Sequence, residues 1–207
     1  MSREVCYRCR RAKVACLCDR IEKQANTIKI IILQHPDEVS NPKGSAIIAK
    51  LGLQQYQCWV GEDFTDHREL NKLIKNAAHE MLVLYPAEQA EDLQPGLPGL
   101  KAPVKYCLII DATWRKARRI WQSNPQLHSL RCAKLVTDKD SNYRIRKVPQ
   151  QGYLSTVESV VEGLRLLEDQ PQAYQPLLVL FDEMIGYQIQ SMGRQVFERN
   201  YDDEAGK

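Results

Sequence analysis

Short runs of aliphatic and β-branched residues alternate with longer amphipathic stretches along most of the chain. The runs predict strands over residues 28–33, 58–60, 81–85 and 104–110. The amphipathic stretches predict helices over about 41–51, 66–79, 114–122, 155–169 and 176–199. Between them, 86–103 has four prolines and two glycines and reads as a loop, while 133–147 reads as extended. Strands that alternate with helices predict an α/β fold whose mostly parallel sheet is flanked by helices.

The composition is that of an ordinary globular protein. The 207 residues are 43% hydrophobic and 27% charged, which is enough to bury one sizeable core. No apolar run approaches the roughly 20 residues of a membrane span, and the charged start of the chain lacks the apolar segment of a signal peptide. We therefore expect a cytoplasmic protein with no membrane partner. No G-x-G-x-x-G or Walker loop follows a predicted strand, which weighs against a dinucleotide enzyme or an NTPase.

The charge is unevenly distributed along the chain. The 29 basic and 26 acidic side chains leave a net charge of +3, yet residues 1–26 carry +4 and residues 113–147 carry +8, so the remainder carries −9. Two basic regions on an acidic body are typical of a nucleic-acid footprint, because phosphate binding depends on local charge density. Two solvated, charge-rich faces are the alternative interpretation.

Four of the seven cysteines lie close together near the start of the chain. They read C-x2-C-x6-C-x-C, with the sulfurs supplied by Cys6, Cys9, Cys16 and Cys18. Four thiolates at short spacings fill the tetrahedral shell of a structural zinc ion, so we expect a small zinc-binding element over residues 1–26. An iron–sulfur cluster or spare thiols are the alternatives. Cys58, Cys107 and Cys132 stand alone and read as small buried hydrophobic residues.

Three of the predicted strands end in residues that suit a ligand site. In open α/β sheets, ligands bind beyond the carboxyl ends of the strands. The three ends read Gln34-His35-Pro36, Tyr85-Pro86 and Asp111-Ala112-Thr113-Trp114. The alternative for His35 is a structural role before the turn proline. For Asp111, capping of the following helix and catalysis both remain open.

Two segments combine cations with aromatic rings. In a helix that starts near Thr113, the arginines lie on a different face from Trp114 and Trp121. In an extended segment, Tyr143 and Lys147 share one side of the chain. A ring for stacking among guanidinium groups is a common arrangement in RNA-binding proteins. We therefore expect an RNA surface formed by Arg115, Arg118, Arg119, Tyr143, Arg144, Arg146 and Lys147.

The predicted helix from residue 155 begins with a capping box. Ser155 and Glu158 form the S-x-x-E pattern, and the apolar residues that follow have the spacing of a core-facing helix. Capping and packing are sufficient to explain these residues. The start of a helix also directs backbone N–H groups and the positive end of the helix dipole outward. The start of this helix is therefore a candidate binding site for a carboxylate.

Taken together, these motifs resemble the DTW-domain family, in particular its bacterial tRNA-uridine aminocarboxypropyltransferases. The matching motifs are DATW at 111–114, S-x-Y-R-I-R-K at 141–147, L-S-T-x-E-S at 154–159, the Q-H-P and L-Y-P strand ends, and the leading cysteine cluster. They cover nearly the whole chain. The family usually has Glu-Ala where this chain has Glu158-Ser159, which is a change between two small residues.

The resemblance implies a fold and an activity. The fold would be SPOUT-like, with residues 27–207 as the catalytic domain and a trefoil knot in its C-terminal half. The activity would transfer the 3-amino-3-carboxypropyl group of S-adenosylmethionine to N3 of a tRNA uridine in the variable loop, releasing methylthioadenosine. No obligate protein partner is implied. The alternatives are a SPOUT-type S-adenosylmethionine-dependent RNA methyltransferase and a non-catalytic, zinc-containing RNA-binding module.

The resemblance also suggests roles for individual residues. Asp111 would accept the N3 proton, or would orient the uracil or the ammonium group of S-adenosylmethionine. The adenosine would lie against Tyr85-Pro86 and Thr113, and the carboxylate would lie near the helix start at Ser155. The residues expected around S-adenosylmethionine are Gln34, His35, Leu84, Tyr85, Pro86, Ile110, Thr113, Trp114, Ser155, Thr156 and Glu158.

Overall fold

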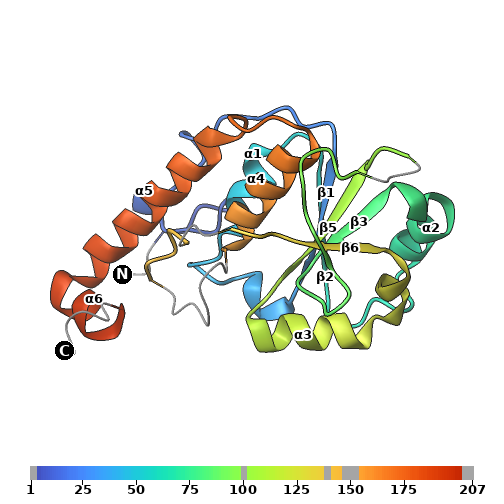
Figure 1. Cartoon of the computed structure of the whole chain (residues 1–207). Coiled ribbons are helices and arrows are strands. Elements are labelled where there is room, and N and C mark those ends of the chain that lie inside the picture. Colours follow the sequence, from blue (N-terminus) through green and yellow to red (C-terminus); the bar gives the residue numbers. More distant parts are fainter. Residues whose placement is uncertain (1–3, 99–101, 138–140, 146–153, 202–207) are drawn as a thin grey trace.

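A parallel sheet forms the centre of the fold. The structure, a computed structural model, describes residues 4–98, 102–137, 141–145 and 154–201. Its strands follow the order β2-β1-β5-β3-β6-β4, and every neighbouring pair is parallel (Figure 1). The strands are β1 (Lys29–Gln34), β2 (Tyr56–Val60), β3 (Met81–Leu84), β4 (Glu91–Asp92), β5 (Tyr106–Asp111) and β6 (Arg131–Lys134). This confirms the predicted α/β class.

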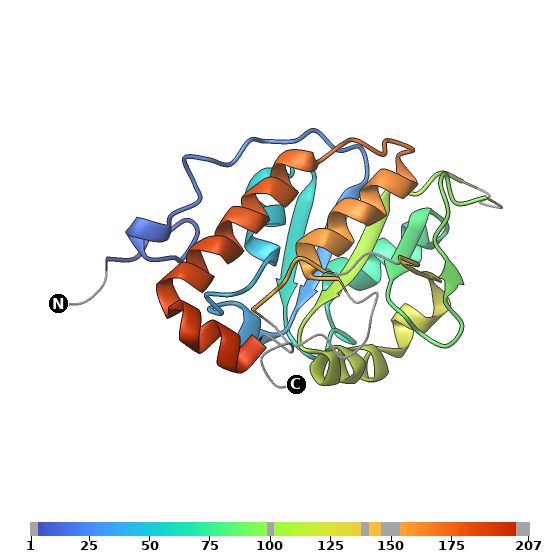
Figure 2. The ribbon, with the colours of Figure 1, turned by 60° about the vertical axis from the view of Figure 1, so that its left-hand side comes forward.

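Helices cover both faces of the sheet. One face carries α1 (Ala46–Gly52), α4 (Thr156–Leu167) and α5 (Gln175–Met192), and α4 and α5 run side by side (Figure 2). The other face carries α2 (Arg68–Ala77) and α3 (Trp114–Ser123). Further helical segments are η1 (Lys13–Ala15), η2 (Pro36–Glu38), η3 (Ala78–Glu80), η4 (Pro125–Ser129) and α6 (Arg194–Tyr201).

The alternation of side chains along β1 explains why both faces are covered. Successive residues of a strand point to opposite faces. Ile30 and Ile32 lie in the apolar cluster under α1, α4 and α5, whereas Ile31 and Leu33 lie in the cluster under α2 and α3. All four side chains are fully buried. A strand that is apolar on both sides is typical of a parallel sheet between two layers of helices.

Three predicted boundaries are wrong. The helix predicted from 41 begins at Ala46, because η2 and a turn closed by a hydrogen bond from the Gly44 N–H to the Asn41 carbonyl precede it. The loop predicted over 86–103 contains β4, which pairs with β6. The helix predicted over 176–199 is divided at Gly193, where the backbone takes a φ of +84°.

The extended segment predicted over 133–147 is in a strand only as far as Lys134 among the described residues, because β6 ends there. Residues 138–140, 146 and 147 lie outside the described residues. The described residues 141–145 form an irregular turn in which Tyr143 and Ile145 are buried. This turn is held by the carboxylate of Glu158 in α4. The carboxylate accepts hydrogen bonds from the Ser141 hydroxyl at 2.6 Å and from the Asn142 N–H at 2.8 Å. A helix side chain therefore supplies the acceptors that a neighbouring strand would otherwise supply.

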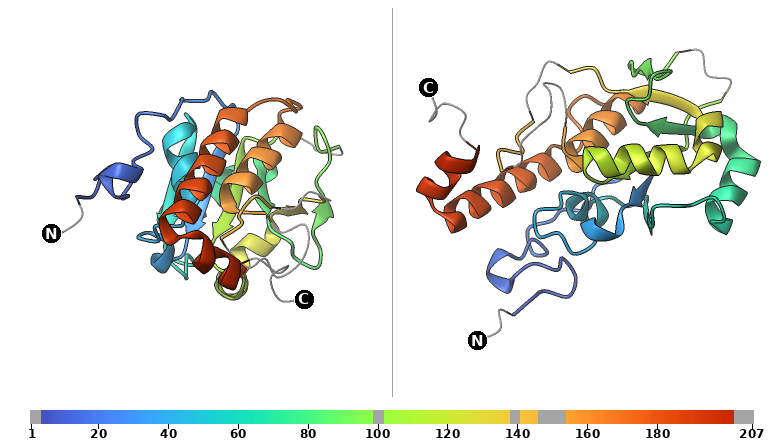
Figure 3. Two further views of the ribbon diagram at one scale, coloured as in Figure 1. Left: turned by 90° about the vertical axis from the view of Figure 1, so that its left-hand side faces the viewer. Right: turned by 90° about the horizontal axis from the view of Figure 1, so that it is seen from below.

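An amino-terminal element of residues 4–26 lies beside α1 and α5, outside the sheet (Figure 3, left). The Arg20 guanidinium lies 2.7 Å from the carboxylate of Glu183 in α5. A backbone bridge joins Gln24 to Leu53, which follows α1. Among the helices described, none combines the length and the apolar character that a membrane span requires.

Two glycines test the packing of the helices on the first face. A Cβ added to Gly52 in α1 would lie 2.3 Å from Cδ2 of Leu177 in α5, which is buried, whereas a Cβ on Gly186 in α5 would meet nothing within 4 Å. We expect Gly52→Ala to lower the free energy of unfolding by roughly 1–3 kcal/mol. Gly186→Ala should raise it by about 0.5–1 kcal/mol through helix propensity. Urea unfolding measures both, and an equal effect of the two substitutions would contradict the close approach of α1 to α5.

Candidate active site

The carboxyl ends of β1 and β5 bring Gln34 and Asp111 together. Gln34 is paired with Asp111 in the parallel register, and its Nε2 donates to Asp111 Oδ2 at 2.8 Å. Thr156, the first residue of α4, donates its hydroxyl to Asp111 Oδ1 at 2.6 Å. Asp111 is only 5% exposed. Hydrogen bonds from two neutral donors therefore stabilise the carboxylate and fix its orientation.

These contacts bear on the two roles that the sequence left open for Asp111. The N-cap residue of α3 is Thr113, whose side chain makes no capping hydrogen bond. The Asp111 carboxylate instead connects β1 to α4. Gln34 and Thr156 thus bind it across the sheet edge, outside the helix that follows it.

Cys58 adjoins Gln34, and Tyr56 adjoins Cys58; neither residue is identified as a site residue from the sequence. Cys58 on β2 lies with its Sγ 3.8 Å from Gln34 Oε1. Burial is the main cause that raises the pKa values of Cys58 and of Tyr56, and the negative charge of Asp111 raises both further. The thiol and the phenol therefore stay neutral at pH 7. The sequence signal that could have found them is the period of two along β2, which places Tyr56 and Cys58 on the same side.

His35 has the structural contacts that were its alternative interpretation. The side chain is 5% exposed, and Nδ1 accepts a hydrogen bond from the Asp37 N–H at 3.1 Å. Nε2 lies 3.1 Å from a carboxylate oxygen of Glu62, and the other oxygen of Glu62 lies 3.1 Å from the Arg119 guanidinium. Because Nδ1 accepts, the ring proton lies on Nε2. His35 therefore links η2 through Glu62 to α3.

The end of β3 lies at the same edge, separated from β1 by β5. Leu84 is buried at the end of this strand, and Pro86 is exposed beyond it. The Tyr85 ring is stacked on Trp121 of α3, with ring centroids 4.9 Å apart. Ile110 and Thr113 are partly buried on β5 and at the start of α3, and Trp114 is 39% exposed. These residues lie at the same sheet edge as Asp111. Among the described residues, the side chains of Gln34 and Thr156 donate hydrogen bonds to its carboxylate.

The start of α4 is occupied by the protein's own groups. The predicted capping box is present, with the Ser155 N–H donating to Glu158 Oε2 at 2.7 Å and the Glu158 N–H donating to Ser155 Oγ at 3.4 Å. The N–H of Val157 donates to the hydroxyl of Ser45, near α1, at 3.3 Å. Ser155 and Glu158 are both buried. Their contacts favour the structural interpretation, with Glu158 holding the 141–145 turn.

The basic face of α3 is partly neutralised. Lys116 pairs with Asp37 and holds the pKa of that carboxyl below its usual value, and Arg119 pairs with Glu62. In the part of the chain that the structure describes, Arg115 and Arg118 are exposed and form no ion pair. Viewed from below, α3 and η2 lie on the side of the sheet that faces the viewer (Figure 3, right).

The second predicted RNA segment needs a correction. Tyr143 is 4% exposed, its ring packs edge-on against Phe181, and its hydroxyl donates to the Lys43 carbonyl, so the ring presents no stacking surface. Arg144 is exposed and pairs with Asp182 at 2.8 Å. Arg146 and Lys147 lie outside the described residues. Tyr7, which the sequence did not single out, is 99% exposed between Cys6 and Cys9.

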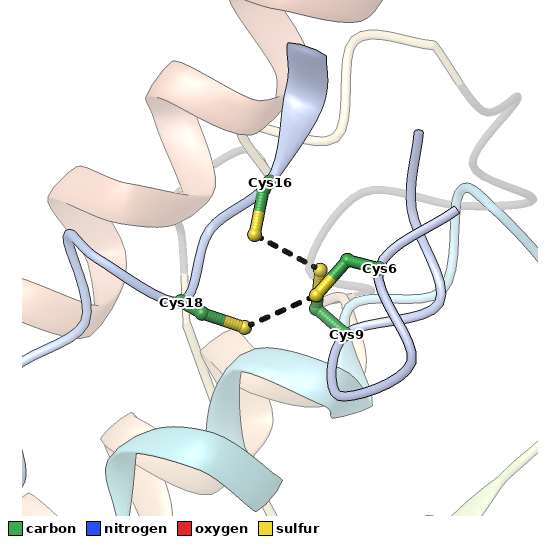
Figure 4. A group of neighbouring side chains, drawn as sticks. All are labelled: Cys6, Cys9, Cys16 and Cys18. Atoms are coloured by element: carbon green, nitrogen blue, oxygen red, sulfur yellow. Dashed lines mark hydrogen bonds between the residues drawn. The ribbon is translucent and has the colours of Figure 1, made fainter. Parts of the chain in front are cut away.

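The four clustered cysteines converge in space. Cys6 and Cys9 face Cys16 and Cys18 (Figure 4), and their sulfur atoms all lie within 4.8 Å of one another. The Cys6–Cys18 and Cys9–Cys16 sulfur distances are 3.8 and 3.7 Å. A zinc ion about 2.3 Å from each sulfur requires sulfurs about 3.8 Å apart, so the donor set fits a tetrahedral metal. Backbone N–H groups of Cys9 and Arg8 lower the pKa of the Cys6 thiol to about 6, which favours a thiolate.

A separate open cavity of about 470 Å³ lies between α4, α5 and the residues Thr137 and Asn142. Its polar walls include Glu158, Arg165 and Asp182. Each is already engaged, Glu158 with the 141–145 turn, Asp182 with Arg144, and Arg165 with the Ala173 carbonyl at 2.7 Å. Contacts within the protein therefore occupy these three polar groups.

Comparisons with known proteins place this chain in a family. A model of the DTW domain matches residues 3–189. The chain is similar to tRNA-uridine aminocarboxypropyltransferase 2 of Drosophila melanogaster, with 33% identity over 194 residues that cover 90% of this chain and 76% of that protein. Proteins of the same name from Macaca fascicularis and Mus musculus are 30% and 28% identical, over 91% of this chain in each case.

The chain spans 64% of the length of each of these two mammalian relatives, which is less than two thirds. All three relatives are animal proteins, whereas the sequence motifs pointed to the bacterial members of the family. No solved structure matches the chain.

Proposed function

This chain belongs to the DTW domain family, and from that premise we propose that it transfers the 3-amino-3-carboxypropyl group of S-adenosylmethionine to N3 of a tRNA uridine. The observation that carries the proposal is the family match over residues 3–189, together with relatives whose names state this activity. Methylthioadenosine would be the second product. The variable-loop uridine and a cytoplasmic site of action are parts of the same proposal.

The proposed reaction exchanges one bond for another. A bond forms between uridine N3 and the terminal carbon of the aminocarboxypropyl group, while the bond from that carbon to sulfur breaks and its electron pair stays on sulfur. S-adenosylmethionine, when bound, supplies three carbons on a good leaving group. The protein's task is to place the correct carbon in line with N3.

In this proposal Asp111 accepts the proton that leaves N3. Gln34 and Thr156 hold its carboxylate in one orientation, and a fixed orientation is a requirement for a general base. The same geometry would allow Asp111 to orient the uracil or the ammonium group of S-adenosylmethionine. The effect of Asp111→Asn distinguishes the two roles, because an amide can orient a substrate but cannot accept the proton.

The cofactor would lie along the edge beside this carboxylate. We place the adenosine against Leu84, Tyr85 and Pro86, where the Tyr85 ring is already held by Trp121, and against Ile110, Thr113 and Trp114. Thr156 would lie near the aminocarboxypropyl arm. His35, Ser155 and Glu158 would shape the pocket through η2 and the start of α4.

The remaining parts of the proposal concern the tRNA and the domain organisation. Arg115, Arg118 and Arg144 would contact phosphates, and Tyr7 would offer the stacking ring that Tyr143 does not. Residues 1–26 would form a zinc element and residues 27–207 a catalytic domain. A SPOUT-like fold with a C-terminal trefoil knot is in keeping with the parallel sheet and the family resemblance.

The reaction is tested by incubating the protein with S-adenosylmethionine and unmodified tRNA and analysing nucleosides and small molecules by mass spectrometry. We expect aminocarboxypropyl-uridine and methylthioadenosine, and a loss of rate of about 10²- to 10⁴-fold in Asp111→Asn. Asp66→Asn, at an exposed turn, is the matched control. Methylated nucleoside with S-adenosylhomocysteine would identify a methyltransferase, and the absence of any product a binding module. An Asp111→Asn protein that keeps most of its rate would exclude the proton-acceptor role alone.

The tRNA surface is tested by the salt dependence of binding. Arg115→Ala and Arg118→Ala should each weaken tRNA binding and reduce the slope of log K against log salt by roughly 0.7–0.9, since each removes one phosphate contact. Lys75→Ala removes an exposed cation from the carboxyl end of α2, at the opposite edge of the sheet, and should change neither quantity. Weaker binding with an unchanged slope would show that these arginines do not contact phosphates.

A further inference from the structure

Arg11 is a buried cation without an adequate partner among its neighbours. The residue is 6% exposed, and its Nε has no hydrogen-bond partner. Its Nη2 lies 2.6 Å from Sδ of Met184 in α5, and a thioether sulfur is a weak acceptor. Within the described residues Arg11 forms no ion pair with a carboxylate. Burial of a charge in this way is costly unless an opposite charge lies nearby.

The neighbouring group that can supply this charge is the cysteine cluster. Arg11 lies at this cluster, because the Cys6 N–H donates to the Arg11 carbonyl at 2.7 Å and Cys9 is two residues before Arg11. Cys9 is itself 3% exposed. Four protonated thiols carry no charge, but four thiolates around one divalent cation carry a net charge of −2. The cluster therefore presents its full negative charge to the guanidinium when it holds its metal.

We propose that Arg11 is the internal counter-ion of a four-thiolate metal centre, and that this pairing holds the amino-terminal element against α5. The inference rests on the zinc site of the proposed function and adds to it a residue that couples the metal to the fold. On binding, the thiols release their protons to solvent and the metal takes four sulfur ligands. Arg11 is then a positioning residue, because it acts through Cys9 and does not contact the reacting atoms.

The chemistry of the guanidinium suits this role. Its charge is spread over a plane and is weakly hydrated, so it is buried at lower cost than an ammonium group and can face several sulfurs. The contact with Met184 places the other side of the group on α5. The neighbouring Arg10 donates to the carbonyl of Val39, which follows η2, at 3.5 Å. Loss of the metal would therefore loosen an element that lies beside the edge of the sheet containing Asp111.

The experiment uses the full-length chain, loaded with zinc, and three variants. Arg11→Met removes the charge and keeps an apolar side chain, and Arg11→Lys keeps the charge. Arg8→Met is the control, because it removes an exposed cation that is even closer to Cys9 in the sequence. We expect one zinc per chain in the wild type. Transfer of zinc to a chromophoric chelator should be about 10- to 100-fold faster in Arg11→Met. It should be intermediate in Arg11→Lys and unchanged in Arg8→Met.

Melting temperatures with and without zinc distinguish a counter-ion role of Arg11 from a role in packing alone. With zinc bound, Arg11→Met should melt at a lower temperature than the wild type. After zinc is removed with a chelator the order should reverse, because the wild type then buries a charge that has lost most of its compensation and the variant buries none. Equal destabilisation of the two metal states, unchanged zinc transfer, or a wild type that binds no zinc would each overturn the inference. None of these results would affect the identity of the product formed from tRNA, which is measured separately.

Discussion

The hydrogen-bonded arrangement around Asp111 is the constraint on which the rest of the site depends. Its carboxylate joins β5 to Gln34 in β1 and to Thr156 at the start of α4. Parallel pairing places Gln34 opposite Asp111, and a slip of one residue would turn the side chains of a strand to the opposite face. Sheet register therefore sets the position of the carboxylate, and the loops beyond the strand ends are arranged around it. The burial of Asp111 is tolerable because both oxygens have donors.

Local patterns predict much of the fold but not the contacts that form the site. The apolar runs of β1 and β5 and the capping box of α4 are visible in the sequence because each is a property of adjacent residues. The two hydrogen bonds to Asp111 span 77 and 45 residues of chain, and no local pattern specifies contacts at such separations. Tyr143 shows a second limit: alternation indicates which residues share a side, but it does not indicate which side faces solvent. Burial of that side against Phe181 removed the expected stacking ring.

Charge counted along the sequence also differs from charge presented by the fold. Lys116 and Arg119 contribute to the basic segment, yet Asp37 and Glu62 pair with them from other parts of the chain. Arg11 contributes to the basic start of the chain, yet it is buried, with its guanidinium against Met184 of α5. In the described part of residues 113–147, the exposed cations that form no ion pair are Arg115 and Arg118, which share one face of α3. That face adjoins the carboxyl edge of the sheet, so the proposed tRNA surface and the proposed reaction centre meet at η2 and α3.

The central claim is that the carboxyl edge of the sheet presents the longest arm of S-adenosylmethionine to an RNA base beside Asp111. A crystal structure of the full-length chain with a non-reactive analogue of S-adenosylmethionine tests it most directly. The account predicts that the adenosine lies at the ends of β3 and β5 and that the aminocarboxypropyl arm points toward Asp111 and the open side of α3. An arm directed away from Asp111, or an analogue bound in the cavity between α4 and α5, would contradict the account.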